Sequence, residues 1–265
     1  MGLAVESAAA PSRFRKGLAV NVERAFGEAL AGQWAADGDE PELLPAQLAR
    51  AAVTTLGVDG VGLSVHATAG HSTPLGASDE AATTAERLQF TAGSGPCMLA
   101  GRSGWPVFAP EDQLRTRWPA FHDLLVTHTP FRSVVALSLP GALRGYGAVD
   151  LYLTHPVGVV TFDAMQALRV AELISGQLSH TADWSEWTET AGPAWTNTAA
   201  ARQRARVWMA TGMVSLALQL ESSDALALLR SYAYAANRSA DAIAADLVIG
   251  RLTTNQLREG AASDH

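Results

Sequence analysis

Arginines stand at helical spacing among small apolar residues near the C-terminus, and their chemistry suits phosphate binding. Arg204 and Arg206 open one predicted helix, Arg230 lies within a second, and Arg238 follows in the next turn. A guanidinium group binds phosphate through paired donors and stacks on flat rings such as unstacked RNA bases. A small helical bundle with these side chains on its surface can therefore bind RNA loops. On spacing alone, surface arginines that only keep the bundle in solution are the simpler interpretation.

The charge of the chain is unevenly distributed. The 265 residues carry a net charge of −7, which argues against nucleic-acid binding by the whole surface. Residues 1–196 hold 12 basic and 20 acidic side chains, a net charge of −8. Residues 197–258 hold 7 basic and 4 acidic side chains, a net charge of +3. This asymmetry favours a nucleic-acid-binding unit at the C-terminal end.

Cys97 is the only cysteine and the most obvious reactive side chain. A thiol acts as a nucleophile or sensor only when its pKa is lowered and solvent reaches it. The pair Pro96-Cys97 at a helix start would lower the pKa through the helix dipole, but the nearest basic residue is Arg102. A lone cysteine is more often a small core residue, and we favour that interpretation. One cysteine cannot form an internal disulfide, which fits a reducing cytoplasm.

Other patterns typical of enzymes are missing from the sequence. The seven histidines are scattered without metal-ligand spacing, and His66, on an apolar strand, is expected to be a core histidine. The glycine-rich stretch 93–96 is not followed by the Lys-Ser/Thr of a phosphate loop, and no Gly-x-Ser-x-Gly elbow occurs. We also find no paired carboxylates at a suggestive spacing. The sequence therefore predicts no catalytic residue, no metal and no cofactor, and hence no enzyme.

Helices and strands alternate over the middle of the chain in an order typical of an α+β domain. Alternating apolar residues predict strands at 61–66, 71–75, 105–108, 132–139 and 146–153, the first two joined by a turn at Ala69-Gly70. Apolar residues at helical spacing predict helices at 14–35, 44–56, 78–88, 118–127 and 162–180, with Ser78 and Thr161 as N-caps. We expect an antiparallel sheet flanked by helices on at least one face.

Composition divides the chain into four segments. Residues 1–40 form a tail and a helix, and residues 41–181 form the α+β domain. Residues 182–201 are predicted to be a linker, because Gly192-Pro193 breaks any helix. Residues 202–258 form an all-α bundle of three short helices. No stretch approaches the ~20 apolar residues of a membrane span, so no membrane span is expected.

Six short motifs follow one another through the α+β segment. They are Leu88-Gln89, Gly93-x-Gly95-Pro96-Cys97, Trp118-Pro119-x-Phe121, Arg132-Ser133-Val134, Gly147-Ala148-Val149-x-Leu151 and Phe162. In this order and spacing the segment resembles a GAF domain, of the type that precedes an ANTAR domain in actinobacterial regulators. The resemblance implies a sensory domain.

GAF domains often bind a small molecule in an apolar pocket between the sheet and its loops. By that resemblance, the candidate lining residues are Phe90, Cys97, Phe108, Trp118, Phe121 and Tyr152. Ordinary core packing explains the same side chains at least as well, so both interpretations stay open.

The C-terminal segment carries a second set of motifs. They are Ala210-Thr211-Gly212, Ala225, Leu228-Leu229-Arg230, Ala233 and Ile243-Ala244. They resemble the pattern of the ANTAR domain, an RNA-binding transcription antitermination module. The resemblance implies a homodimer that binds paired hairpins in leader transcripts, with apolar stripes of helices 14–35 and 162–180 as candidate dimer surfaces. The residues it assigns to RNA binding are Arg204, Arg206, Ala210, Thr211, Gly212, Arg230, Ala233 and Arg238.

Three positions depart from the ANTAR pattern. The family usually has Lys where Thr211 stands and a larger aliphatic residue where Ala240 stands, and Asp241 occupies a position that is often basic. The loss of one phosphate contact weakens electrostatic binding and lowers its salt dependence by about one charge. The leading hypothesis is a cytoplasmic, signal-responsive antitermination regulator. The alternatives are a ligand-binding or dimerisation regulator whose C-terminal end no longer binds RNA, and a GAF-type enzyme or thiol sensor acting through Cys97.

Overall fold

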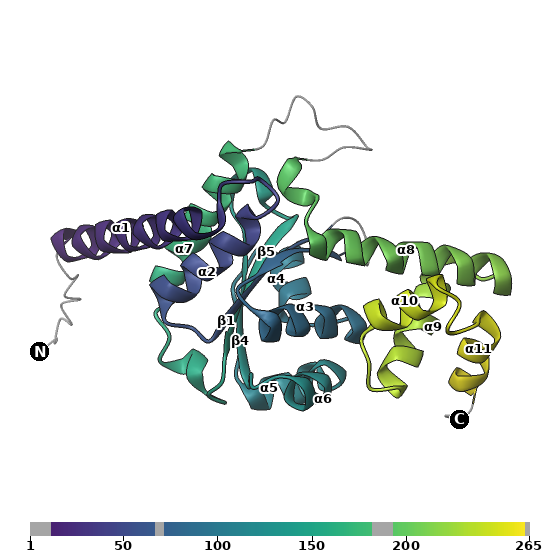
Figure 1. Ribbon diagram of the computed structural model, residues 1–265. Helices are drawn as coiled ribbons and strands as arrows, with labels where there is room; N and C mark the ends of the chain where they lie inside the picture. The colour runs from purple at the N-terminus through teal and green to yellow at the C-terminus, as the bar shows by residue number, and fades with distance from the viewer. Residues whose placement is uncertain (1–11, 67–71, 182–192, 263–265) are drawn as a thin grey trace, which may run out of the picture.

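The computed structural model describes residues 12–66, 72–181 and 193–262 (Figure 1). A sheet with helices on both faces occupies residues 12–181, here called the sheet domain, and helices alone make up residues 199–262, here called the C-terminal module. The expected tail at 1–11, the turn at Ala69-Gly70 and residues 182–192 of the expected linker lie outside the described residues.

Five antiparallel strands form the sheet, which confirms the predicted α+β class. The strands are β1 (Gly60–His66), β2 (Ser72–Ala77), β3 (Val107–Ala109), β4 (Ser133–Ser138) and β5 (Gly147–Leu153), in the order β2-β1-β5-β4-β3. Side chains alternate between the two faces of a strand. In β5, Val149 and Leu151 therefore pack on one face, whereas Asp150 and Tyr152 point to the other.

Three helices cover the first face of the sheet. They are α1 (Ser12–Asp37), α2 (Leu44–Leu56) and α7 (Ala164–His180), which lie together on one side in Figure 1. Val22, Phe26 and Leu30 of α1 are buried in the same core as Ile174 and Leu178 of α7. The described part of the α1 stripe, which was expected to be a dimer surface, is thus covered within one chain, because α1 packs on α2 and α7.

Four helices lie over the second face. They are α3 (Glu80–Ala92), α4 (Pro96–Ser103), α5 (Glu111–Arg117) and α6 (Pro119–His128). The N-cap of α3 is Asp79, not Ser78, because the Asp79 carboxylate accepts a hydrogen bond from the Ala82 N–H at 2.8 Å. The Ser78 hydroxyl instead accepts a hydrogen bond from the Val61 N–H in β1 at 3.0 Å. Likewise Asp163, rather than Thr161, caps α7.

The C-terminal module contains four α-helices in its described residues. They are α8 (Ala199–Leu218), α9 (Ser222–Ala235), α10 (Ala240–Val248) and α11 (Thr254–Ala262). The first three match the expected bundle, and α11 adds a helix that the sequence did not predict. Small and branched residues such as Val207, Ala210, Leu229, Ala233 and Ile243 form its core.

The end of the expected linker packs on the sheet domain. Trp195 is fully buried in the core that contains Leu178 of α7, and its Nε1–H donates to the Leu178 carbonyl at 2.9 Å. The described end of the expected linker is therefore packed against the sheet domain.

Candidate functional site

A set of polar side chains lies between the sheet and helices α3 and α4, where an apolar core would be expected. We call it the buried polar cluster; its members are Ser64, His66, Glu86, Gln89, Cys97, Asp150 and Tyr152. Two strands supply four of these side chains, since alternation points every second residue of β1 and β5 toward α3 and α4.

Two carboxyl groups meet at the centre of the cluster. The Tyr152 hydroxyl donates to Glu86 Oε1 at 2.7 Å, and Gln89 Nε2 donates to Asp150 Oδ2 at 2.6 Å. Gly62, the residue paired with Asp150 across the sheet, makes room for Glu86, because a Cβ there would lie 2.2 Å from Glu86 Oε1. Chain folding thus pairs carboxylates that the sequence places far apart.

Burial sets the protonation of this pair. It raises the pKa of Glu86 to about 8, with the charge of Asp150 as the second cause. Burial also raises the pKa of Asp150, to about 6, against the lowering effect of its hydrogen bond from Gln89. Near neutral pH the two carboxyls therefore hold one proton between them.

Cys97 is hydrogen-bonded within the cluster. Its Sγ lies 3.1 Å from His66 Nε2 and 3.2 Å from Ser64 Oγ, and its N–H donates to Gln89 Oε1 at 3.0 Å. Burial, followed by the charges of Asp150 and Glu86, raises the pKa of the thiol. Burial and the nearby Arg102 charge lower the pKa of His66 to about 4. A neutral thiol beside a neutral imidazole is a poor nucleophile, so the geometry favours a structural role for Cys97.

The six predicted pocket residues do not line one cavity. Cys97, Trp118, Phe121 and Tyr152 lie on the α3–α6 side of the sheet, whereas Phe108 packs against the core on the opposite face. Phe90 belongs to the core of the C-terminal module.

Two hollows among the described residues are lined by other side chains. One, of ≈ 20 Å³, is bordered by Glu86, by strand β2 and by Ala200 of α8. The other, of ≈ 370 Å³, lies at the surface beside Arg102, Trp105 and Arg144.

The C-terminal module contacts the sheet domain through what we call the arginine clasp: Phe90, Arg204, Arg230 and Asp241. Arg204 is 1% exposed and forms a two-point ion pair with Asp241, with distances of 3.0 Å and 3.1 Å. Its Nη1 donates to the Ser72 carbonyl of β2 at 2.8 Å. The Cζ atoms of Arg204 and Arg230 lie 3.5 Å and 4.2 Å from the centre of the Phe90 ring. Both guanidinium groups therefore make cation–π contacts with one aromatic residue of α3.

Further hydrogen bonds join the two parts around the clasp. Thr91 Oγ1 accepts from the Ala240 N–H at 2.9 Å, and Arg87 Nη2 donates to Gln203 Oε1 at 2.6 Å. The C-terminal end of α3, drawn in Figure 1, lies against α9 and α10 as a result.

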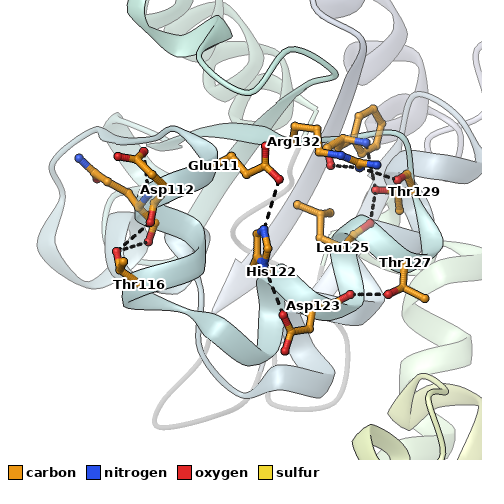
Figure 2. Close-up of polar contacts among 11 residues, drawn as sticks. Glu111, Asp112, Thr116, His122, Asp123, Leu125, Thr127, Thr129 and Arg132 are labelled. Carbon is orange, nitrogen blue, oxygen red and sulfur yellow. Dashed lines mark hydrogen bonds and ion pairs between the residues drawn. The ribbon is translucent and has the colours of Figure 1, made fainter.

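A second contact joins α9 to α6 near the surface. The Tyr234 hydroxyl donates to Asp123 Oδ2 at 3.2 Å. Figure 2 shows Asp123 beside His122, whose two ring nitrogens lie 3.3 Å from Asp123 and 3.4 Å from Glu111. His122 is buried and contacts both carboxylates, and Asp123 in turn accepts the hydrogen bond from Tyr234 of the module.

The residues assigned to RNA by resemblance divide into three groups. Arg206, Gly212 and Arg238 are exposed, with Arg238 paired to Asp246 at 2.7 Å. Ala210, Thr211 and Ala233 are buried, and the Thr211 hydroxyl donates to the Val207 carbonyl at 2.8 Å. Arg204 and Arg230 belong to the arginine clasp. The eight residues therefore do not form one accessible surface in this arrangement.

The buried polar cluster was not recognised in the sequence. Glu86 and Asp150 lie far apart along the chain, in α3 and β5, so no local spacing indicates that they pair. One signal was present: Asp150 is a charged residue in the middle of the apolar strand 147–153. A charge at that position has to be paired or hydrogen-bonded when the strand is buried.

Comparison with known proteins identifies similar folds only. No family model matches the sequence, and no curated protein matches it. Similar solved structures include a free methionine-R-sulfoxide reductase from Neisseria meningitidis, with 16% identity, a TM-score of 0.42, and coverage of 66% of this chain and 95% of that one. They also include the GAF domain of a phosphoenolpyruvate-protein phosphotransferase from Coxiella burnetii, with 11% identity, a TM-score of 0.43, and coverage of 62% and 95%. At these TM-scores, neither likeness carries an argument about ligands or activity.

Two further observations concern the described residues only. None of their helices is long and apolar enough to cross a bilayer. They contain no group of three or more His, Cys, Asp or Glu side chains placed to hold a metal ion.

Proposed function

We propose that this chain is a cytoplasmic, signal-responsive regulator of transcription antitermination. The C-terminal module binds paired RNA hairpins, and the sheet domain, which resembles a GAF domain, receives the signal. Two copies act together, one module to each hairpin, as the resemblance to ANTAR proteins implies.

Direct contact between the two parts of the chain carries this proposal. Two arginines that the resemblance assigns to RNA, Arg204 and Arg230, lie on Phe90 of the sheet domain. A change at α3 therefore reaches the RNA-binding side chains without an intermediate element. This arrangement is what a sensory domain needs in order to control an output module.

Exposed cations on the module support the RNA partner. Arg202, Arg206, Arg238, Arg251 and Arg258 all lie at its surface. Within an acidic chain, such a group gives one end an attractive potential for phosphates.

A second candidate function is favoured by the pairing of Arg204 with Asp241. That ion pair neutralises one arginine, and Thr211 is buried where the family carries Lys. The chain would then be a ligand-binding or dimerisation regulator without RNA affinity. We assign no catalytic step to the buried polar cluster, since its thiol and imidazole are both neutral.

Binding to tandem hairpin RNAs with hexanucleotide loops separates the two candidates. We expect the intact protein to prefer the tandem hairpin over a duplex of equal length. Arg206→Ala should weaken binding, whereas Arg24→Ala on α1, an exposed arginine outside the module, should not. Equal affinity for hairpin and duplex, or no binding at all, would leave the second candidate.

A further inference from the structure

Phe90 is an aromatic residue of the sheet domain that is buried by the C-terminal module. It lies in the last turn of α3, is 1% exposed, and also meets Trp208 edge to face at a centroid distance of 5.8 Å. An aromatic ring in contact with two guanidinium groups resembles, in its chemistry, a nucleic-acid base stacked on arginine. The face of α3 thus offers these arginines the same kind of partner that an RNA loop offers.

We infer that the α3 face and RNA compete for Arg204 and Arg230, so that the clasped arrangement is the RNA-free state. This inference rests on the proposed function. RNA binding requires the module to leave α3, and a signal received by the sheet domain acts by weakening or strengthening that contact.

The composition of the clasp makes such an exchange physically reasonable. Arg204 and Asp241 both belong to the module, so their ion pair survives separation from α3. At the clasp, separation removes the contacts with the Phe90 ring, the Ser72 carbonyl and the Thr91 hydroxyl. Elsewhere on the boundary it removes the Arg87–Gln203 and Tyr234–Asp123 hydrogen bonds. No ion pair across the boundary has to be broken at these residues.

The state of Arg230 favours the same exchange. Burial against the sheet domain, and next the charge of Arg204, lower the pKa of Arg230 to about 10. The charged guanidinium thus loses hydration in the clasped state. RNA phosphates accept charge-assisted hydrogen bonds from a guanidinium group, so RNA binding favours the state in which Arg230 has left Phe90.

Hydrogen–deuterium exchange of the full chain tests this competition directly. The backbone amides of residues 80–92 are followed with and without a saturating tandem hairpin RNA. We expect exchange at the C-terminal end of α3 to increase when RNA binds, while the module becomes protected. Protection of the module with α3 unchanged would overturn the inference, because RNA would then bind the clasped form.

An engineered disulfide that holds the module against α3 provides a second test. Thr91 Oγ1 lies 2.9 Å from the Ala240 nitrogen, so the two residues are in direct contact across the boundary. They are therefore the pair to test for a disulfide, whose Cα atoms lie about 4.4–6.8 Å apart. In the double variant Thr91→Cys/Ala240→Cys, oxidation should lower RNA affinity by about tenfold or more. Reduction of the same sample should restore it. Unchanged affinity in the oxidised form, with the disulfide verified by mass spectrometry, would contradict the inference.

Failure of the inference differs from failure of the proposed function. Hairpin binding by the reduced protein with no response of α3 would preserve the function and reject the competition. Lack of binding by the wild type and by the reduced double variant would reject both. Binding by a Phe90→Ala variant that exceeds wild-type binding by about tenfold would support both.

Discussion

The two carboxyls beneath the sheet are the residues whose chemistry departs most from ordinary core packing. Glu86 and Asp150 are buried without a positively charged partner in direct contact among the described residues. Their hydrogen-bond donors are the neutral side chains of Tyr152 and Gln89. A proton shared between them avoids burying two negative charges. Stability should therefore depend on pH through this pair.

The pH dependence has a definite sign. The pKa of Glu86 is raised to about 8 in the folded state, so the folded protein holds a proton that the unfolded chain releases. The free energy of unfolding should consequently fall as pH rises from 6 to 8, by on the order of 1 kcal/mol per pH unit. Urea unfolding of the wild type and of Glu86→Gln measures this, and the variant should lose most of the slope. Glu28→Gln, an exposed control, should keep it; a slope shared by all three proteins would refute the assignment.

Cys97 should react as a buried core thiol. Because burial raises its pKa and leaves it 2% exposed, an aromatic disulfide reagent at pH 7 should label it at least about tenfold more slowly in the folded protein than in urea. Rapid labelling of the folded protein would instead revive the thiol-sensor hypothesis.

At the scale of elements, α3 connects the two candidate sites. Its middle supplies Glu86 and Gln89 to the buried polar cluster, and its last turn supplies Phe90 to the arginine clasp. Glu86 lies three residues before Gln89 and four before Phe90, which places the three side chains on one side of the helix, with Phe90 nearer its end. Stability of α3 should therefore affect both sites at once.

The N-cap of α3 provides a test at this scale. Asp79→Ala removes the acceptor for the Ala82 N–H and should lower the free energy of unfolding by about 1 kcal/mol. Asp79→Asn keeps a capping side chain and should retain most of the stability. Thermal unfolding of the three proteins gives the comparison, and equal losses in the two variants would argue against capping as the cause.

The sequence predicted most of these elements for local reasons. Strands 61–66, 132–139 and 146–153 and the long helices follow from apolar periodicity, which acts over a few residues. Helix α5 was not predicted, and α4 was considered only as a helix start at Pro96-Cys97, because the glycines and prolines between 93 and 110 are typical of loops. The caps were misplaced by one or two residues because Ser78 precedes Asp79 and Thr161 precedes Asp163, and both members of each pair are capping types.

The candidate sites were harder to predict because they depend on long-range packing. The Arg204–Asp241 ion pair and the Glu86–Asp150 pair join residues from different elements, and no local pattern specifies such contacts. Asp241 was interpreted as a loss of RNA-binding charge, whereas the structure gives it a partner inside the module.

At the scale of the whole molecule, the ion pair of the clasp should be costly to break on one side only. Asp241→Ala leaves Arg204 buried without its counter-ion and should lower the free energy of unfolding by about 3–5 kcal/mol. The double variant Arg204→Met/Asp241→Leu removes both charges and should recover most of that loss. Chemical unfolding of the single and double variants checks this. Additive losses would mean that the two residues do not act as a pair.

The salt dependence of RNA binding tests the central claim most directly. Affinity of the wild-type chain for a tandem hairpin RNA is measured from low to moderate salt, beside Arg238→Ala and the control Arg24→Ala. The proposed function predicts a steep fall in affinity with salt, a slope reduced by about one charge in Arg238→Ala, and no change in the control. Binding that is absent, or whose slope is the same in all three proteins, would contradict an RNA-binding role for the C-terminal module.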